Sequence, residues 1–511
     1  MAPYNACTEL LDRNVDVGRG AKPAFVDHAR ALTYAQLQGD TRRLANLLGR
    51  LGVRREERVV MIVADTVEFP VIFLGAIRAG IVPAPLNTLL SPEHFAYILE
   101  DSRARVLFVS QQLLAGVEPA LAMAPNIEHV VVIDGDARAP RLDFASALAA
   151  ESDEFETAAT NADEPAFWLY SSGSTGAPKG TRHVHTSLMA TAKLFAQGVL
   201  GMREDDIIHS AAKLFFAYGL GNSLSFPMSV GATTILNPLR PTPETVFDVL
   251  GKHQPTIFCG VPTLFAAMLN DAKLAGHKGS ARLRLCTSAG EALPEHVGKG
   301  FETRFGAAII DGVGSTEMLH IYLSNAPGDV VYGTSGRAVP GYDVTLRDDQ
   351  GAPTPQGDVG EMYVRGPSAA DGYWNQREKS RATFQGEWTR TGDKYVCDAA
   401  GRYTYCGRAD DMFKVSGIWV SPFEVEAALA SHPAVLEAAV VPHPDDEGLL
   451  KPKAFIVVRQ DIELDGLDRS LKEHVKLAVG MWKYPRWVEI VEGLPKTATG
   501  KIQRFKLREG A

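Results

Sequence analysis

Cysteine is scarce in this chain and is not arranged in pairs. Only 5 cysteines occur among 511 residues, and no two of them have a Cys-x-x-Cys spacing. An odd set without that spacing argues against a disulfide framework and against a zinc site built from cysteines. We therefore expect five buried thiols in a reducing compartment.

Long apolar runs and an excess of positive charge are also missing. No uninterrupted apolar stretch reaches the roughly 18 residues of a membrane helix, and the first residues show no basic region followed by an apolar one. The net charge is −9 and the pI is about 5.9, which gives no general attraction to nucleic acid or to an anionic membrane. We expect a cytoplasmic protein with neither partner, which binds anions only at a local site.

Short valine- and isoleucine-rich runs alternate with longer segments of helical spacing through the first four fifths of the chain. With 45% hydrophobic and 22% charged residues, the chain is globular, and 511 residues are too many for one core. Helical spacing at residues 33–51 and 91–100 between such runs predicts an α/β fold with mainly parallel sheets. The predicted strands are 58–63, 105–109, 129–133, 166–170, 233–236, 256–258 and 308–310.

The last third of the chain has a different composition. Gly/Pro/Asp turns near residues 348–357 and 401–407 predict a β-rich subdomain at about 335–409. Ser421, Pro422 and Glu424 then form a predicted capping box that opens a small α+β unit. We place the boundary near Asp410, which gives an N-terminal domain of residues 1–409 and a C-terminal domain of residues 410–511. The predicted elements of the small domain are strands at 435–441 and 454–458 and a helix at 467–479.

The strongest motif is Tyr170-Ser-Ser-Gly-Ser-Thr-Gly-Ala-Pro-Lys-Gly180, which follows a predicted buried strand. Glycines allow close approach of backbone N–H groups, while hydroxyls and one lysine add donors and positive charge, so phosphate fits best. A plain surface loop is the alternative, and eleven ordered positions argue against it. The spacing differs from the Walker pattern, so a magnesium ligand must come from elsewhere. The candidate ATP-binding residues here are Ser171, Ser172, Gly173, Ser174, Thr175, Gly176 and Lys179.

This motif resembles the signature loop of the adenylate-forming superfamily, which contains acyl-CoA ligases, non-ribosomal adenylation domains and luciferases. Further segments match in the same order over nearly the whole chain, and together they look most like the benzoate-CoA ligases. The resemblance implies ATP and Mg²⁺ as cofactors, coenzyme A as acyl acceptor, and a C-terminal domain that is mobile about a hinge matching Asp410.

The resemblance assigns nucleotide contacts to three further segments. In Asp311-Gly-Val-Gly-Ser-Thr-Glu317, Thr316 is implied to contact phosphate and Glu317 to ligate magnesium, although the last four residues alone read equally as a helix N-cap. Asp393 and Arg408 are implied to contact ribose, although Asp393 alone is typical of a solvated turn. The remaining implied nucleotide contacts are Ser288, Ala289, Gly290, Glu291, Asp311 and Gly312.

The implied catalytic residues of the tail are Lys501 and Lys414. An ammonium flanked by glycine can bridge an attacking carboxylate and a phosphate oxygen, whereas the alternative for Lys501 is a surface lysine in a basic tail. Lys414 is implied to support thioester formation, and stabilisation of an interdomain surface is an equal alternative. The implied pantetheine channel consists of Ser416, Gly417, Ile418 and Trp419.

Two segments are implied to line the acid pocket. They are Lys213-Leu-Phe-Phe-Ala-Tyr-Gly-Leu-Gly221 and the run that contains His320. Aromatic walls with small neighbours suit a flat ring, although each aromatic is individually typical of a core. A ring hydroxyl or amino group would meet His320, Tyr218 or Ser225, so benzoate, hydroxybenzoate and aminobenzoate stay open. The pocket residues are Phe216, Ala217, Tyr218, Gly314, His320 and Ile321.

We therefore expect an aryl-acid:CoA ligase (AMP-forming) that acts on an aromatic carboxylic acid. The alternatives are an enzyme that loads a separate carrier protein, and a non-catalytic nucleotide-binding regulator. The resemblance also implies a lysine acetyltransferase that acts on Lys501. The sequence leaves the oligomeric state open, a homodimer included.

Overall fold

The computed structural model describes residues 3–135, 137, 139–171, 177–271, 276–277, 279–409, 411–415, 418–459, 462–496 and 502–509. The chain separates into two compact units, Met1–Asp343 with Val364–Thr389 and Val344–Tyr363 with Arg390–Ala511. Asp410 lies outside the described residues, so the boundary placed there stays a prediction. Among the described residues, no helix has the length and apolar character to cross a bilayer.

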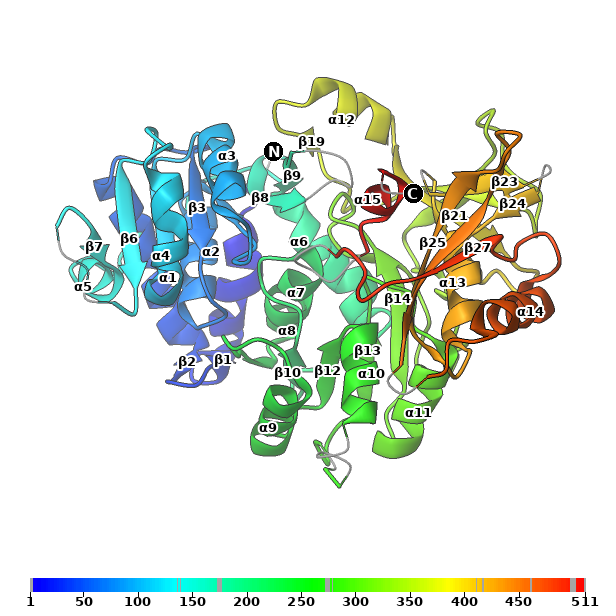
Figure 1. The fold of residues 1–511 in the computed structure, drawn as a ribbon. Coiled ribbons are helices and arrows are strands. Elements are labelled where there is room, and N and C mark those ends of the chain that lie inside the picture. Colours follow the sequence, from blue (N-terminus) through cyan, green and yellow to red (C-terminus); the bar gives the residue numbers. More distant parts are fainter. Residues whose placement is uncertain are drawn as a thin grey trace. The chain divides into compact units, whose positions relative to one another are not determined.

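The larger sheet of the first unit has nine strands, and its centre is parallel (Figure 1). Strands β10 to β14 and β1 pair in parallel, while β2 at one edge and β15 and β16 at the other are antiparallel. In sheet order the strands are β16 (Arg337–Ala338), β15 (Ile321–Ser324), β14 (Ile309–Gly314), β13 (Leu285–Ser288), β12 (Ile257–Gly260), β10 (Ile207–Ser210), β11 (Thr233–Ile235), β1 (Pro23–Val26) and β2 (Ala31–Thr33).

Three amphipathic helices cover part of this sheet. They are α9 (Pro243–His253), α10 (Pro262–Asn270) and α11 (Glu295–Phe305), whose apolar sides share one core cluster with β12, β13 and β14. The cap of α9 is local, because the Thr242 side chain accepts from Thr245 N and Pro243 occupies the first turn. These helices leave the carboxyl ends of the parallel strands to loops, which is where open α/β sheets hold ligands.

A second sheet of the same unit is parallel throughout. Its order is β4 (Val82–Pro85), β3 (Arg58–Ile62), β5 (Val106–Ser110), β6 (His129–Ile133) and β7 (Leu142–Asp143). Every residue of α2 (Glu68–Arg78) is buried, as expected of a helix whose residues between Glu68 and Arg78 are all apolar. The other helices of this region are η1 (Thr8–Asp12), η2 (Val15–Arg19), α1 (Tyr34–Arg50), α3 (Pro92–Ser102), α4 (Gln111–Leu121) and α5 (Phe144–Ala149).

A three-stranded antiparallel sheet carries the phosphate-loop motif. Its order is β19 (Gly372–Tyr373), β9 (Lys179–Val184) and β8 (Pro165–Ser171). Ser171 pairs with Lys179, so the motif is the connection between two paired strands. Nearby helices of this unit are α6 (His185–Thr191), η3 (Ala192–Gln197), α7 (Ala217–Leu220), η4 (Gly221–Ser225), α8 (Phe226–Val230) and α12 (Arg377–Thr383).

The second unit is α+β. Its first sheet is made of β17 (Asp343–Arg347), β18 (Gly360–Arg365), β21 (Trp388–Cys397) and β22 (Tyr403–Arg408). The short strand β20 (Phe384–Gln385), which pairs with the first two residues of β21, falls in the first unit. The following elements are the hairpin β23 (Phe413–Val415) and β24 (Ile418–Val420), the sheet β25 (Val435–Pro444), β26 (Leu450–Val458) and β27 (Trp487–Ile490), and the helices α13 (Pro422–Ala430), α14 (Leu467–Val479) and α15 (Arg504–Glu509). Helices α13 and α14 share one apolar core with β25 and β26.

The predicted α/β class is confirmed, and two local predictions are wrong. Only half of the capping box forms, because Ser421 caps Glu424 N while the Glu424 carboxylate binds Lys483 at 2.8 and 2.6 Å. Cys397 and Cys406 are half-buried rather than buried, because they lie on the paired strands β21 and β22, whose residues are largely half-buried. The cysteines that are buried as predicted are Cys7, Cys259 and Cys286.

Candidate functional site

A polar cluster of the first unit joins Lys179, Tyr373 and Glu317. The Tyr373 hydroxyl donates to Glu317 Oε1 at 2.7 Å, and Lys179 Nζ lies 3.3 Å from the same hydroxyl and 3.8 Å from Glu317 Oε1. The Lys179 and Glu317 side chains are only 19% and 17% exposed. A lysine at the end of the phosphate-loop motif therefore meets the predicted magnesium ligand.

Tyr373 was not predicted to belong to this site. Strand β19 pairs with β9, and Tyr373 lies opposite Thr181, two residues after Lys179. The phenol ring also lies under Lys179 Nζ, 4.4 Å from the ring centroid, which favours a cation. No local pattern in the sequence identifies a partner that comes from so distant a strand.

The turn that carries Thr316 and Glu317 is fixed through its backbone. The His183 imidazole Nε2 donates to the Thr316 carbonyl at 2.9 Å, and Ala370 N donates to the Glu317 carbonyl at 2.8 Å. Burial lowers the pKa of His183 to about 4, so the ring is neutral near pH 7. No helix begins at this turn in the described structure, so the N-cap alternative for residues 314–317 does not hold.

Two neighbouring strands present buried polar atoms beside the predicted adenine segment. Ser288 ends β13 and lies opposite Asp311 on β14. Ser288 and Asp311 are buried, and burial raises the pKa of Asp311 to about 8, while the Ser288 side chain and the Leu293 backbone oppose that rise. Gly290 has φ +94° and faces open space, so a ligand can approach its backbone. Ala289 is buried and Glu291 is exposed.

The glycines of β14 have a packing reason of their own. A Cβ added at Gly312 would lie 2.7 Å from the Leu323 carbonyl oxygen, and one at Gly314 would lie 2.4 Å from the His320 carbonyl oxygen. Close pairing with β15 therefore requires glycine at both positions, whether or not a ligand is bound. Their ligand contacts stay a prediction.

The residues predicted for the acid pocket lie partly together. The centroid of the His320 ring lies 5.5 Å from that of Tyr218 and 4.4 Å from that of Phe226. A Cβ added at Gly221 would collide with the His320 ring. Ile321, the residue after His320, is the first residue of the buried strand β15. Phe216 is instead 36% exposed and contacts Phe215 at 4.6 Å, while Ala217 is half-buried.

Hydrogen bonds define the state of the two polar pocket side chains. The Tyr218 hydroxyl lies 2.7 Å from Thr287 Oγ1. His320 Nε2 donates to the Tyr218 carbonyl at 3.2 Å, and its Nδ1 has no partner among the described residues. Burial lowers the pKa of His320 to about 3. Nδ1 is therefore a buried, neutral acceptor.

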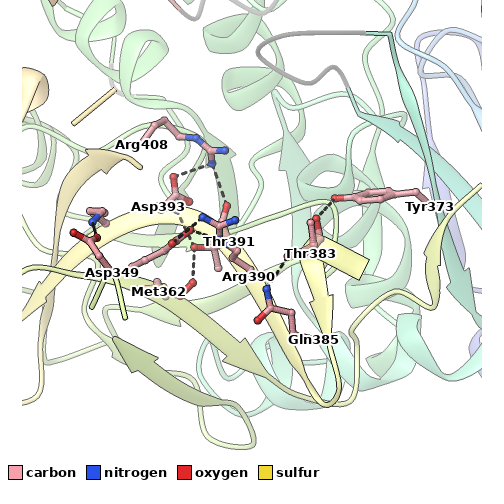
Figure 2. A network of polar contacts seen from close by, with 12 residues as sticks. Asp349, Met362, Tyr373, Thr383, Gln385, Arg390, Thr391, Asp393 and Arg408 are labelled. Atoms are coloured by element: carbon pink, nitrogen blue, oxygen red, sulfur yellow. Dashed lines mark hydrogen bonds and ion pairs between the residues drawn. The ribbon is translucent and has the colours of Figure 1, made fainter. Parts of the chain in front are cut away.

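In the second unit, the two predicted ribose contacts bind each other. Asp393 on β21 lies opposite Arg408 on β22, and Arg408 Nη1 is 2.9 Å from Asp393 Oδ1 and 3.2 Å from the Thr391 carbonyl (Figure 2). The Asp393 side chain is 16% exposed and that of Arg408 is 44% exposed. This pair presents a carboxylate and a guanidinium from adjacent strands.

Several predicted residues lie outside the described part of the structure. These are the loop residues Ser172, Gly173, Ser174, Thr175 and Gly176, the hinge Asp410, the channel residues Ser416 and Gly417, and the catalytic Lys501. For Lys414, Ile418 and Trp419 only the backbone is described, and Lys414 lies opposite Trp419 in the β23–β24 hairpin. Among the described residues, no group of three or more His, Cys, Asp or Glu side chains is arranged to hold a metal ion.

Comparison with known proteins gives matches along nearly the whole chain. Residues 11–374 match the family "AMP-binding enzyme", and residues 424–501 match "AMP-binding enzyme C-terminal domain". A 4-hydroxybenzoate–CoA/benzoate–CoA ligase of Rhodopseudomonas palustris is 54% identical over 508 residues, which cover 99% of this chain and 94% of the relative.

Two solved structures extend this likeness to the fold. A benzoate CoA ligase from Burkholderia xenovorans superposes with a TM-score of 0.90 at 48% identity, covering 99% of this chain and 100% of that one. An anthranilate CoA ligase in complex with anthranoyl-AMP superposes with a TM-score of 0.94 at 43% identity, covering 100% of this chain and 98% of that one.

Proposed function

The chain belongs to the AMP-binding enzyme family, and from this membership we propose that it is an aryl-acid:CoA ligase (AMP-forming). In the first half-reaction, the carboxylate of an aromatic acid attacks the α-phosphorus of ATP, which gives aroyl-AMP and releases pyrophosphate. In the second, the thiol of coenzyme A attacks the aroyl carbonyl, which gives aroyl-CoA and AMP.

The observation that carries this proposal is the Lys179–Tyr373–Glu317 cluster. The 3.8 Å ion pair places a cation and a carboxylate side by side at the end of the phosphate-loop motif. Lys179 supplies positive charge for the nucleotide phosphates, and Glu317 supplies the negative charge that a metal on those phosphates needs. Both charges are largely shielded from solvent, which strengthens their effect on a bound polyphosphate.

A magnesium ion fits Glu317. Magnesium is commonly held by one or two carboxylates together with substrate phosphates and water rather than by an all-protein cage. The Tyr373 hydroxyl donates a hydrogen bond to Glu317 Oε1 and so orients the carboxylate. When bound, Mg²⁺ neutralises charge on the departing pyrophosphate. Tyr373 and the Ala370 N–H bond at the Glu317 carbonyl fix where this carboxylate lies.

Lys501 is the residue that we propose for the chemical step of adenylation. Its ammonium reduces the repulsion between the carboxylate and the α-phosphate as they converge. Lys501→Ala is expected to lose acid-dependent exchange of pyrophosphate into ATP while it still binds ATP. Undiminished exchange in that variant would refute the role of Lys501. Asp393 and Arg408 are proposed to contact the ribose hydroxyls.

The acid that we propose is benzoate or a ring-substituted benzoate. The aromatic surroundings of His320 suit a flat ring, and its buried acceptor Nδ1 would pair with a ring hydroxyl or amino group. A panel of benzoate, hydroxybenzoates, aminobenzoates and aliphatic acids, scored by CoA-dependent AMP release, tests the class. Preference for aliphatic acids would overturn it.

Two finer proposals concern partners. Acetylation of Lys501 by a lysine acetyltransferase would remove the charge that adenylation uses. Mass spectrometry of the native protein measures the acetylated fraction of Lys501, and activity should fall as that fraction rises. A homodimer is the oligomeric state that we propose, and light scattering on the purified chain tests it.

A further inference from the structure

The segment that follows Lys501 is held by a largely buried ion network within the second unit. Arg504, the first residue of α15, directs Nε and Nη2 to the two carboxylate oxygens of Glu426 on α13, at 3.0 and 2.6 Å. Val440 N on β25 donates to the same carboxylate at 2.7 Å. Glu426 is only 7% exposed, so this fork has one well-defined geometry.

The same network reaches the residue that follows the predicted hinge. Arg504 Nη1 lies 3.6 Å from Asp411 Oδ2, and Arg508 Nη2 lies 3.3 Å from Asp411 Oδ1. Asp411 N and Met412 N both donate to the Arg408 carbonyl at 3.0 Å, so Asp411 is held in a tight turn. We call Glu426, Arg504, Asp411 and Arg508 the Glu426 network.

Apolar contacts and a short ladder hold the described residues on either side of 497–501, the range that includes Lys501. Ile502 and Leu507 pack on a cluster of Ala439, Val441, Phe455 and Leu494. Lys496 pairs with Ile502 in an antiparallel bridge, and Gln503 N donates to the Pro495 carbonyl at 2.8 Å. Lys501 therefore directly precedes the fixed residue Ile502 and lies three residues before Arg504.

The buried Glu426–Arg504 pair is not explained by stability alone, because burying two charges costs free energy. Burial raises the pKa of the Glu426 carboxyl, and Arg504 opposes that rise. Replacing a buried pair by neutral groups is often neutral or favourable for stability, whereas removing one partner is costly. A buried fork of this kind is therefore better explained by the geometry that it fixes.

We propose that Glu426 and Arg504 are positioning residues for Lys501. The pair holds α15, and adenylation depends on this positioning of the lysine whereas thioester formation does not. The inference rests on the proposed function, in which Lys501 serves the first half-reaction only. A purely structural role for the pair predicts equal losses in both half-reactions.

The test uses a variant that loses the fork without leaving a buried charge. Arg504→Met alone would strand the Glu426 carboxylate, so the informative protein is the double variant Glu426→Gln/Arg504→Met, whose amide still accepts from Val440 N. The matched control is Lys483→Met, which breaks the more exposed ion pair to Glu424 on the same helix. Arg504→Lys keeps the charge but not the fork.

Each half-reaction is measured separately on the full chain. Adenylation is followed by benzoate-dependent pyrophosphate exchange, and thioester formation by aroyl-CoA produced from supplied benzoyl-AMP and coenzyme A. A misplacement of about 1 Å typically costs about 100-fold in rate, so we expect exchange to fall about 100-fold in the double variant. Thioester formation and the thermal midpoint should stay as in the wild type, and Arg504→Lys should recover part of the exchange.

The outcomes separate this inference from the proposed function. Equal losses in both half-reactions, or unchanged exchange in the double variant, overturn the positioning role. A loss of the same size in Lys483→Met overturns it as well. If the wild type shows no acid-dependent exchange, or Lys501→Ala keeps it, the proposed function or the role of Lys501 fails first, and the inference fails with it.

Discussion

Replacing Tyr373 by phenylalanine isolates one hydroxyl at the nucleotide site. The variant keeps the ring that contacts Phe384 at 5.3 Å and Lys179 at 4.4 Å. It removes the donor to Glu317 Oε1 at 2.7 Å and the oxygen that lies 3.3 Å from Lys179 Nζ. The carboxylate that we propose as magnesium ligand therefore loses the group that orients it, while the packing stays.

The magnitude follows from the kind of hydrogen bond. A bond to a charged group contributes about 1.5–3 kcal/mol, and about 1.4 kcal/mol corresponds to a tenfold change in rate. We therefore expect kcat/KM for adenylation to fall about 10- to 100-fold. Loss of a group that orients a metal ligand typically costs the same factor in affinity or activity.

The assay is benzoate-dependent pyrophosphate exchange over a range of Mg²⁺ concentrations. Tyr373→Phe should need more Mg²⁺ to reach half of its maximal rate. Tyr332→Phe is the matched control, because Tyr332 also donates to a carboxylate, Glu302 Oε2 at 3.0 Å, but has no place in the proposed site. An unchanged rate and Mg²⁺ requirement in Tyr373→Phe would refute the reasoning.

Three further predictions concern other parts of the chain. Arg78 is 1% exposed and pairs with Asp12 at 2.6 Å, so Arg78→Met should lower the free energy of unfolding in urea by about 3–5 kcal/mol; a loss near zero would contradict this. Burial raises the pKa of Asp311 from 3.8 to about 8. This carboxyl therefore contributes stability that is complete below the lower value and lost as pH rises through the higher one. Between pH 3.8 and about 8, the free energy of unfolding in urea should decline in the wild type, and Asp311→Asn should lack that decline. An identical decline in the variant would exclude Asp311 as its source. Gly417→Leu should impair thioester formation from benzoyl-AMP more than pyrophosphate exchange, because a side chain there obstructs the proposed channel; equal losses would count against the channel.

The sequence predicted well those features whose signals are local. The alternation of apolar runs and helical spacing gave the α/β class, and β3, β6 and α1 lie within two residues of the predicted ranges. Hydrophobic periodicity records which face of an element is buried, so elements can be recognised one at a time. The phosphate-loop motif is recognisable for the same reason, since its glycines and hydroxyls are contiguous, but residues 172–176 lie outside the described residues and its role in binding phosphate stays a prediction.

Local signals failed where a partner was distant. Glu424 was predicted to complete a capping box, yet it binds Lys483, which lies on a later segment. Phe216 is 36% exposed and contacts Phe215, and its place in the acid pocket stays a prediction.

The amino-acid sequence by itself therefore determined the class of fold, and it predicts the loop that suits a nucleotide and the residues available for acid activation. Only the tertiary structure decided that Tyr373 lies beside Glu317 and that Arg504 is fixed by Glu426. The physical reason is that strand pairing and buried ion pairs join residues far apart in the chain, and their energies depend on burial that exists only after folding.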